Sequence, residues 1–96
     1  MNNEGRNTLR VIEEGIKRYN RTHSPEANAK LIKFMENNKE FEVEFTGSFC
    51  ETCGIRDWLE DLKYILEDLG LNTELTEMKE IAYGRYIGKY KVLKST

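Results

Sequence analysis

The segment from Ile55 to Leu69 constrains the fold of this chain more than any other, because its apolar residues recur at helical spacing. These residues are Ile55, Trp58, Leu59, Leu62, Ile65, Leu66 and Leu69. Most of the positions between them are charged, so one stripe of the helix is apolar and the opposite face is solvated. Gly70 follows as a helix stop. The pattern predicts an amphipathic helix that must bury its stripe against another element.

The run FEVEF, just before this helix, alternates strictly between apolar and acidic residues. Phe41, Val43 and Phe45 fall on one side and the two glutamates on the other, which predicts a half-buried strand. After the helix, β-forming residues dominate from residue 71 onward. A hairpin turn at 88–89, or bulges at Gly84 and Gly88 in one long bent strand, would both fit this segment. Two or three further strands are therefore expected.

Two helices are predicted in the first 38 residues. Thr8 can cap the first, whose apolar residues recur at helical spacing until about residue 20. The sequence SPEA then gives a second start, with Ser24 as N-cap and Pro25 at the first helical position. Asn37 and Asn38 are suitable stop residues because asparagine tolerates the left-handed conformation. The N-terminal part is therefore expected to be a helical hairpin.

The order of these elements favours a single α+β domain over residues 1–96. A helical hairpin over 1–38 would precede a βαββ core over 39–96. A strand, a crossover helix and a returning strand favour a right-handed βαβ unit, with the last strands added antiparallel. We therefore expect a small mixed sheet covered by helices on one face.

The net charge of −2 hides an uneven distribution along the chain. Residues 1–35 sum to +3, residues 36–80 to −9 and residues 81–96 to +4. In one interpretation the basic ends fold back over the acidic middle, or pair with it in a dimer. In the other, the basic tail contacts an anion.

Composition and hydropathy are typical of a globular domain. Hydrophobic residues make up 39% of the chain and charged residues 33%. No apolar stretch approaches the ~20 residues that span a bilayer, and the first ten residues contain no apolar signal region. We therefore expect a cytoplasmic protein without a membrane partner.

Both cysteines lie between the predicted strand and helix, as a C-x-x-C pair in TGSFCETCG. A thiol at a helix N-terminus is acidified by the helix dipole, which favours the nucleophilic thiolate. The stretch VEFTGSFCETCG resembles the active-site junction of thioredoxin-like proteins, where a strand and an aromatic residue lead into C-x-x-C at the start of a helix. The resemblance implies a thiol-disulfide redox protein or redox sensor. Cys50 would be the attacking thiol, Cys53 the resolving thiol and Phe49 the shielding aromatic.

Two other interpretations of the cysteine pair remain open. Structural zinc takes four ligands, and a two-fold dimer could supply them as Cys50 and Cys53 from each chain. Zinc bound in this way is the only cofactor expected. Alternatively, the pair is structural, with Cys53 packed as a small apolar residue at the corner. Glu51 and Asp57 beside the pair favour the neutral thiols. The only proline, Pro25, lies upstream in the predicted helical hairpin.

The segment YGRYIGKYK, residues 83–91, interleaves aromatic and basic residues on the expected strands. Exposed tyrosines can stack on bases while lysine and arginine contact phosphates. A nucleic-acid surface would then consist of Arg85, Tyr86, Lys89, Tyr90 and Lys91. In the alternative interpretation, the tyrosines are cross-strand partners that cover the core.

Three functions are therefore expected, in descending order. The first is a protein-binding or self-associating module whose partner is another protein or a second copy of the chain. The second is the thiol-disulfide redox protein, which is the only enzyme expected, and the third is the nucleic-acid-binding module. His23 is expected to be an exposed loop residue. The sequence contains no P-loop, dinucleotide-binding fingerprint or metalloprotease signature.

Overall fold

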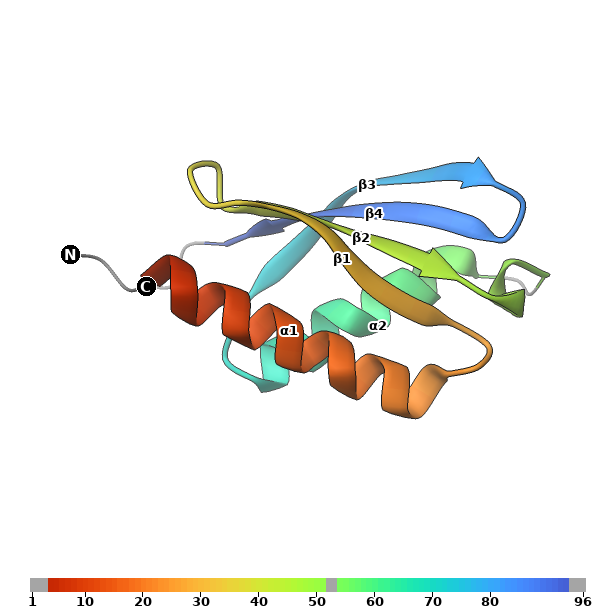
Figure 1. Ribbon diagram of the computed structural model, residues 1–96, viewed down its shortest axis with the longest axis horizontal. Coiled ribbons are helices and arrows are strands. Elements are labelled where there is room, and N and C mark those ends of the chain that lie inside the picture. The colour runs from red at the N-terminus through yellow and green to blue at the C-terminus, as the bar shows by residue number, and fades with distance from the viewer. Residues whose placement is uncertain (1–3, 52–53, 94–96) are drawn as a thin grey trace.

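The computed structural model describes residues 4–51 and 54–93. Within these ranges the elements are α1 (Glu4–His23), β1 (Asn28–Met35), β2 (Glu40–Thr46), the short 3-10 helix η1 (Ser48–Glu51), α2 (Ile55–Asp68), β3 (Thr73–Ala82) and β4 (Arg85–Val92). Figure 1 shows α1 and α2 on one face of a four-stranded sheet. The predicted class, an α+β fold with helices covering one face of a small sheet, is confirmed.

The strands lie in the order β1-β2-β4-β3, and every neighbouring pair is antiparallel. Because β2 and β3 are both antiparallel to β4, they run in the same direction with β4 between them. The β2–α2–β3 unit is thus a split βαβ unit. The prediction of a mixed sheet was wrong, because the last strand is inserted where a parallel contact was expected.

The predicted second helix is instead the edge strand β1. Residues 24–27 form a connection in which the Ser24–Pro25 peptide is cis, and β1 pairs with β2 through Leu31 opposite Val43 and Phe34 opposite Phe41. The expected stop residues, Asn37 and Asn38, lie in the hairpin turn between the two strands. Cross-strand pairing of apolar side chains outweighs the local capping signals here. The N-terminal helical hairpin over 1–38 was therefore wrong, and α1 also extends beyond both predicted ends.

The C-terminal segment forms two strands, with a turn that differs from both expectations. Tyr83 and Gly84 connect β3 to β4, and Gly84 has a φ of 77°. Gly88 lies in the middle of β4, where an added Cβ would come within 3.1 Å of Leu59 Cδ2 and of Tyr90 Cε1. A close approach to the core, and not a turn, thus requires this glycine.

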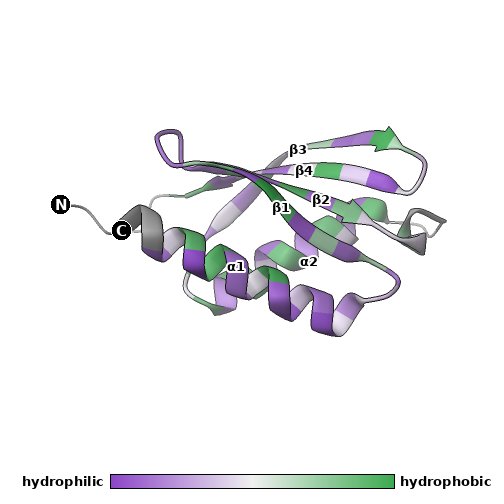
Figure 2. Cartoon of the chain, in the orientation of Figure 1, coloured by the Kyte–Doolittle hydropathy of each residue, from purple (hydrophilic) through white to green (hydrophobic). Residues whose placement is uncertain are grey.

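The core lies between the sheet and the two helices. Phe41, Val43 and Phe45 are fully buried, as the alternation of FEVEF predicted, and Figure 2 shows the same alternation along the sheet. The helices contribute Ile12, Ile16, Tyr19, Leu59, Leu62 and Leu66. Gly15 allows α1 to lie close to α2, because a Cβ there would overlap Leu66 Cδ2. Neither helix in the described ranges has the length and apolar composition that a membrane crossing requires.

Two buried tyrosines anchor α2 to the rest of the fold. Tyr19 Oη on α1 donates a hydrogen bond to Trp58 O (2.8 Å), and Tyr90 Oη on β4 donates one to Leu59 O (2.7 Å). Two successive carbonyls of α2 thus accept hydrogen bonds from the neighbouring helix and from the sheet. The orientation of α2 is therefore fixed by polar contacts as well as by apolar packing.

Candidate functional site

The cysteine corner is only partly described. Cys50 belongs to η1, but its side chain and the whole of Cys53 lie outside the described part of the chain. Phe49 is fully buried, with its ring centroid 5.8 Å from that of Trp58 and 5.7 Å from that of Tyr86. The redox, zinc and structural interpretations of the pair all stay predictions.

The predicted nucleic-acid residues do not share one surface. Tyr86 and Tyr90 point toward the helices and are 9% and 0% exposed. Arg85, Lys89 and Lys91 alternate with them along β4 and so lie on the opposite, open face of the sheet. The strand thereby separates the aromatic rings from the cations that were expected to act with them.

Lysines and arginines on the open face lie beside carboxylates of neighbouring strands. Arg85 Nε is 3.7 Å from Glu44 Oε2, and Lys89 Nζ is 3.8 Å from Glu40 Oε1. Lys91 lies between Glu40 and Glu74 in the register of the sheet. The interpretation that a basic end folds beside the acidic middle is confirmed for β4.

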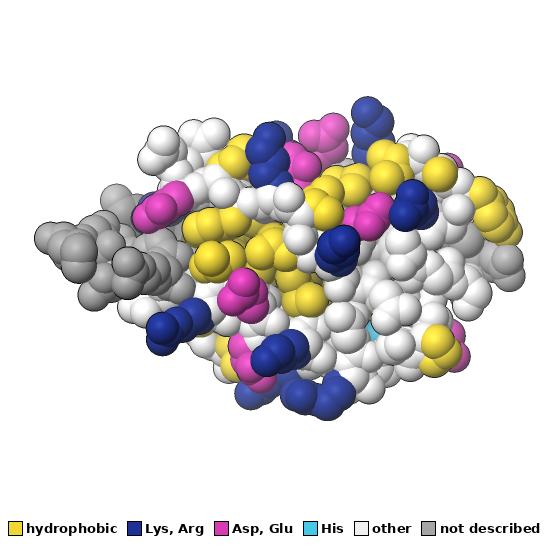
Figure 3. All heavy atoms as spheres, viewed as in Figure 1, with side chains coloured by type: hydrophobic (Ala, Val, Ile, Leu, Met, Phe, Trp, Pro, Cys, Tyr) yellow, Lys and Arg dark blue, Asp and Glu magenta, His cyan; other side chains and the backbone are white. Residues whose placement is uncertain are grey.

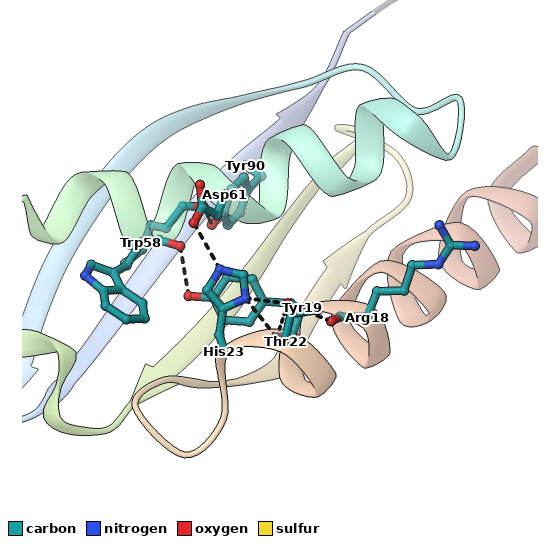
Figure 4. Close-up of polar contacts among 8 residues, drawn as sticks. Arg18, Tyr19, Thr22, His23, Trp58, Asp61 and Tyr90 are labelled. Carbon is teal, nitrogen blue, oxygen red and sulfur yellow. Dashed lines mark hydrogen bonds and ion pairs between the residues drawn. The ribbon is translucent and has the colours of Figure 1, made fainter.

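A polar cluster that the sequence did not indicate joins α1 to α2, as Figure 4 shows. His23 is the last residue of α1, and its Nε2 lies 3.0 Å from Asp61 Oδ2 on α2. Its ring stacks on Tyr19 with a centroid distance of 4.0 Å and an angle of 3°. Its Nδ1 lies 2.7 Å from Thr22 Oγ1. The expectation of an exposed loop residue was wrong, since the His23 side chain is only 17% exposed.

A pocket of about 340 Å³ adjoins this cluster, lined by Arg18, Thr22, His23, Asp61, Tyr64, Ile65 and Asp68. A hydroxyl, an imidazole and a carboxylate therefore lie in a row, as nucleophilic catalysis requires. However, the main-chain groups beside His23 are carbonyl oxygens at the C-terminal end of α1, such as Tyr19 O at 3.0 Å from Nδ1. Carbonyls repel a developing oxyanion, which catalysis of acyl transfer would have to stabilise. The cluster is better suited to holding the two helices together.

We expect the His23 ring to stabilise the fold more through stacking on Tyr19 than through its polar contacts. His23→Ala removes the stacking on Tyr19 together with the polar contacts of both ring nitrogens and should lower the free energy of unfolding by about 1–2 kcal/mol. His23→Phe keeps a ring on Tyr19 but loses the contacts with Thr22 and with Asp61, which is 51% exposed, and should cost less than about 1 kcal/mol. Urea denaturation of the two variants measures the difference. Equal losses would show that the polar contacts of the ring dominate.

Hydrophobic side chains also gather along the seam between α1 and β1, which Figure 3 shows. Val11, Leu31 and Phe34 are partly buried and pack against the core cluster. This apolar surface is therefore the margin of the core. The remaining candidate surfaces are the two outer edges of the sheet, at β1 and at β3.

The main-chain hydrogen bonds of β4 show which residues of the sheet direct their N–H and C=O groups toward β4 and which direct them away from it. Leu93 N–H donates to Asn72 O (2.8 Å) on the β3 side, whereas Val92 N–H donates to Lys39 O (2.7 Å) on the β2 side. Ladder partners alternate along an antiparallel strand. The register of β4 against β2 has no bulge. Odd-numbered residues of β4 therefore direct their N–H and C=O groups toward β3, and even-numbered residues direct theirs toward β2.

The outer edge of β1 is partly occupied by a side chain of α1. By the same alternation, Phe45 directs its N–H and C=O groups toward β4. The main-chain groups of its partner Ala29 therefore point outward, away from β2. There Asn20 accepts a hydrogen bond from Ala29 N–H at Oδ1 (2.7 Å) and donates one from Nδ2 to Ala29 O (3.0 Å). This carboxamide takes the place of a pairing strand. A bulge between Leu31 and Lys33 interrupts the edge further along.

Among the residues that the structure describes, contacts to the outer edge of β3 occur only near its start. Arg56 Nη2 donates to Leu75 O (3.4 Å). Farther on, Met78 and Glu80 lie opposite even-numbered residues of β4, so their N–H and C=O groups point away from β4. Every residue from 76 to 82 is exposed, including Met78 at 36% and Ile81 at 47%. We call residues 77–82 the free edge of β3.

Comparison with known proteins adds no functional information. No protein-family profile and no curated protein matches the chain. Among the described residues, no group of three or more histidine, cysteine or acidic side chains is placed to hold a metal ion. The outward main-chain groups of Met78 and Glu80 make the free edge of β3 the candidate site that the geometry supports best.

Proposed function

We propose that the protein is a binding module that pairs the free edge of β3 with an extended segment of another polypeptide. The observation that carries the proposal is the outward direction of the main-chain groups of Met78 and Glu80. An unpaired row of such groups is a template for strand addition, in which main-chain hydrogen bonds supply affinity and flanking side chains supply selectivity. A cytoplasmic location, expected from the sequence, is part of the same proposal.

Side chains beside this edge support strand addition over other uses of the surface. Met78 lies opposite Gly88, so its side chain shares the helix-covered face, where it leaves apolar area exposed. Glu77 and Lys79 alternate with it on the open face. An added strand would therefore meet Met78 and Glu80 on the helix-covered face and Glu77 and Lys79 on the open face, each row with its own pairing requirement.

Proline at position 80 tests the proposal, because it removes an outward N–H and no ladder hydrogen bond. Proline is accepted at such positions of edge strands. We expect Glu80→Pro to bind an array of synthetic extended decapeptides at least about tenfold more weakly than the wild type, and to lose any self-association in parallel. Glu80→Ala is the matched control, because it removes the same carboxylate and keeps the N–H.

The two variants separate main-chain pairing from side-chain contacts. Strand addition at the free edge is supported when Glu80→Ala retains binding or self-association that Glu80→Pro has lost, with both variants folded by circular dichroism. The proposal is overturned if Glu80→Pro equals the wild type in both assays, or if the wild type neither binds a peptide nor self-associates.

A further inference from the structure

We infer that the partner of the free edge is a second copy of the same chain, paired antiparallel through a two-fold axis at Met78. This inference rests on the proposed function and names the occupant of the same edge. An isologous interface requires a surface that is complementary to itself. The charges along β3 satisfy that requirement in one register.

Four two-fold registers can be compared, each centred on one residue from 77 to 80. An axis at Glu77, Lys79 or Glu80 places two like charges directly opposite each other, which destabilises a strand pair. An axis at Met78 places two methionines at the centre. In that register Glu77 of each copy lies opposite Lys79 of the other, which gives two attractive pairs.

Main-chain geometry independently favours the same axis. Met78 directs its N–H and C=O groups outward, so two copies of Met78 can exchange both hydrogen bonds across the axis. Register shifts occur at Thr76 and Ile81, which leaves residues 77–80 as the regular stretch of the edge. The result is a continuous eight-stranded sheet with α1 and α2 of both copies on one side.

The other edge does not offer the same self-complementarity. Its charged residues are Lys30 and Lys33, so two copies of β1 would bring only positive charges together. In addition, Asn20 occupies the main-chain groups of Ala29. A β1 edge could attract β3 of another copy, but that contact is heterologous and would build open chains of molecules instead of closed dimers.

Charge reversal at positions 77 and 79 tests the register directly. Lys79→Glu brings two pairs of glutamates together across the axis, and we expect dimer affinity to fall about tenfold or more in sedimentation equilibrium. Glu77→Lys should have the same effect through two pairs of lysines. A mixture of the two variants should form a heterodimer with affinity close to that of the wild type, because each new charge then faces an opposite one.

Two controls keep the outcome decisive. Lys79 lies opposite the uncharged Ile87 in its own chain, so Lys79→Glu should fold even if Glu77→Lys, which faces Lys89, does not. In that case Lys79→Glu tests the register by itself, and Lys79→Gln, which removes the charge without reversing it, should weaken the dimer less. Lys17→Glu makes the same charge change on the exposed face of α1 and should leave the dimer unchanged.

Each result separates this inference from the proposed function. A wild type that stays monomeric over a wide concentration range but binds peptides in a Glu80→Pro-sensitive way overturns the self-pairing alone. Self-association that responds to Glu80→Pro but not to the charge reversals overturns the Met78 register. Assemblies larger than a dimer indicate the heterologous β1–β3 contact and also overturn it. Self-association unaffected by Glu80→Pro overturns both proposals.

Discussion

Replacing Gly47 with alanine is expected to lower the free energy of unfolding by at least about 3 kcal/mol. Gly47 follows β2 with a φ of 139°, a region of backbone conformation that side chains rarely allow. An added Cβ would also overlap the main-chain oxygen of Glu26 and lie 3.1 Å from Ala27 Cα. These are backbone atoms, so they cannot move aside as a flexible side chain would. The strain of the conformation and the steric overlap therefore add.

Gly70→Ala provides the matched control for this substitution. Gly70 also has a positive φ, 92°, but an added Cβ there would meet no atom within 4 Å. We therefore expect it to cost only about 1 kcal/mol, the strain of the conformation alone. Urea denaturation of both variants isolates the overlap with Glu26 as the difference. A Gly47→Ala variant no less stable than Gly70→Ala would show that the contact between residues 26 and 47 is loose in solution.

The elements predicted correctly from sequence are those whose local pattern agrees with their environment. FEVEF alternates because β2 has helices on one face and solvent on the other, and the stripe of α2 packs against the side of the sheet that FEVEF buries. The fold class follows from these two segments. Their periodicities require a half-buried strand and an amphipathic helix regardless of how the remaining segments connect.

The error at β1 has a physical cause. Residues 24–35 combine a helix-start signal at Ser24 and Pro25 with residues such as Ile32 and Phe34, which are as compatible with a strand as with a helix. Only the presence of β2 as a partner decides between the two. That partner acts through the register Phe34 opposite Phe41, a contact across the hairpin turn that no local pattern displays. Strand order, and therefore the identity of the edges, has the same long-range origin.

The candidate site was missed for a related reason. Beyond Leu75, β3 contains only scattered apolar residues, which is a weak signal of a strand exposed on both faces and along one edge. Position on the edge cannot be obtained from that pattern, because it depends on β4 lying between β2 and β3. The contact of His23 with Asp61 likewise depends on how α1 and α2 pack together.

Alkaline pH is expected to unfold the protein through two tyrosines. Burial, and to a smaller degree the Asp61 carboxylate, raises the pKa of Tyr19 well above 10. Burial is also the main cause that raises the pKa of Tyr90, with smaller contributions from Tyr19 and Glu60. Both hydroxyls donate hydrogen bonds to α2, which requires the protonated form.

The sign of the pH dependence follows from the proton count. Above pH 10 the unfolded chain loses its tyrosine protons while the folded chain keeps them, so the unfolded state binds fewer protons and stability falls as pH rises. Each tyrosine should contribute a loss of about 1.4 kcal/mol per pH unit between its unfolded and folded pKa values, and none below that window.

Urea midpoints measured from neutral pH upward reveal the slope. Tyr19→Phe and Tyr90→Phe should each be less stable than the wild type at neutral pH but should lose stability less steeply above pH 10. Compared at the same pH, the variants share the titration of lysines with the wild type, so the change in slope is assigned to the tyrosines. An unchanged slope in the double variant would show that neither hydroxyl is held protonated by the fold.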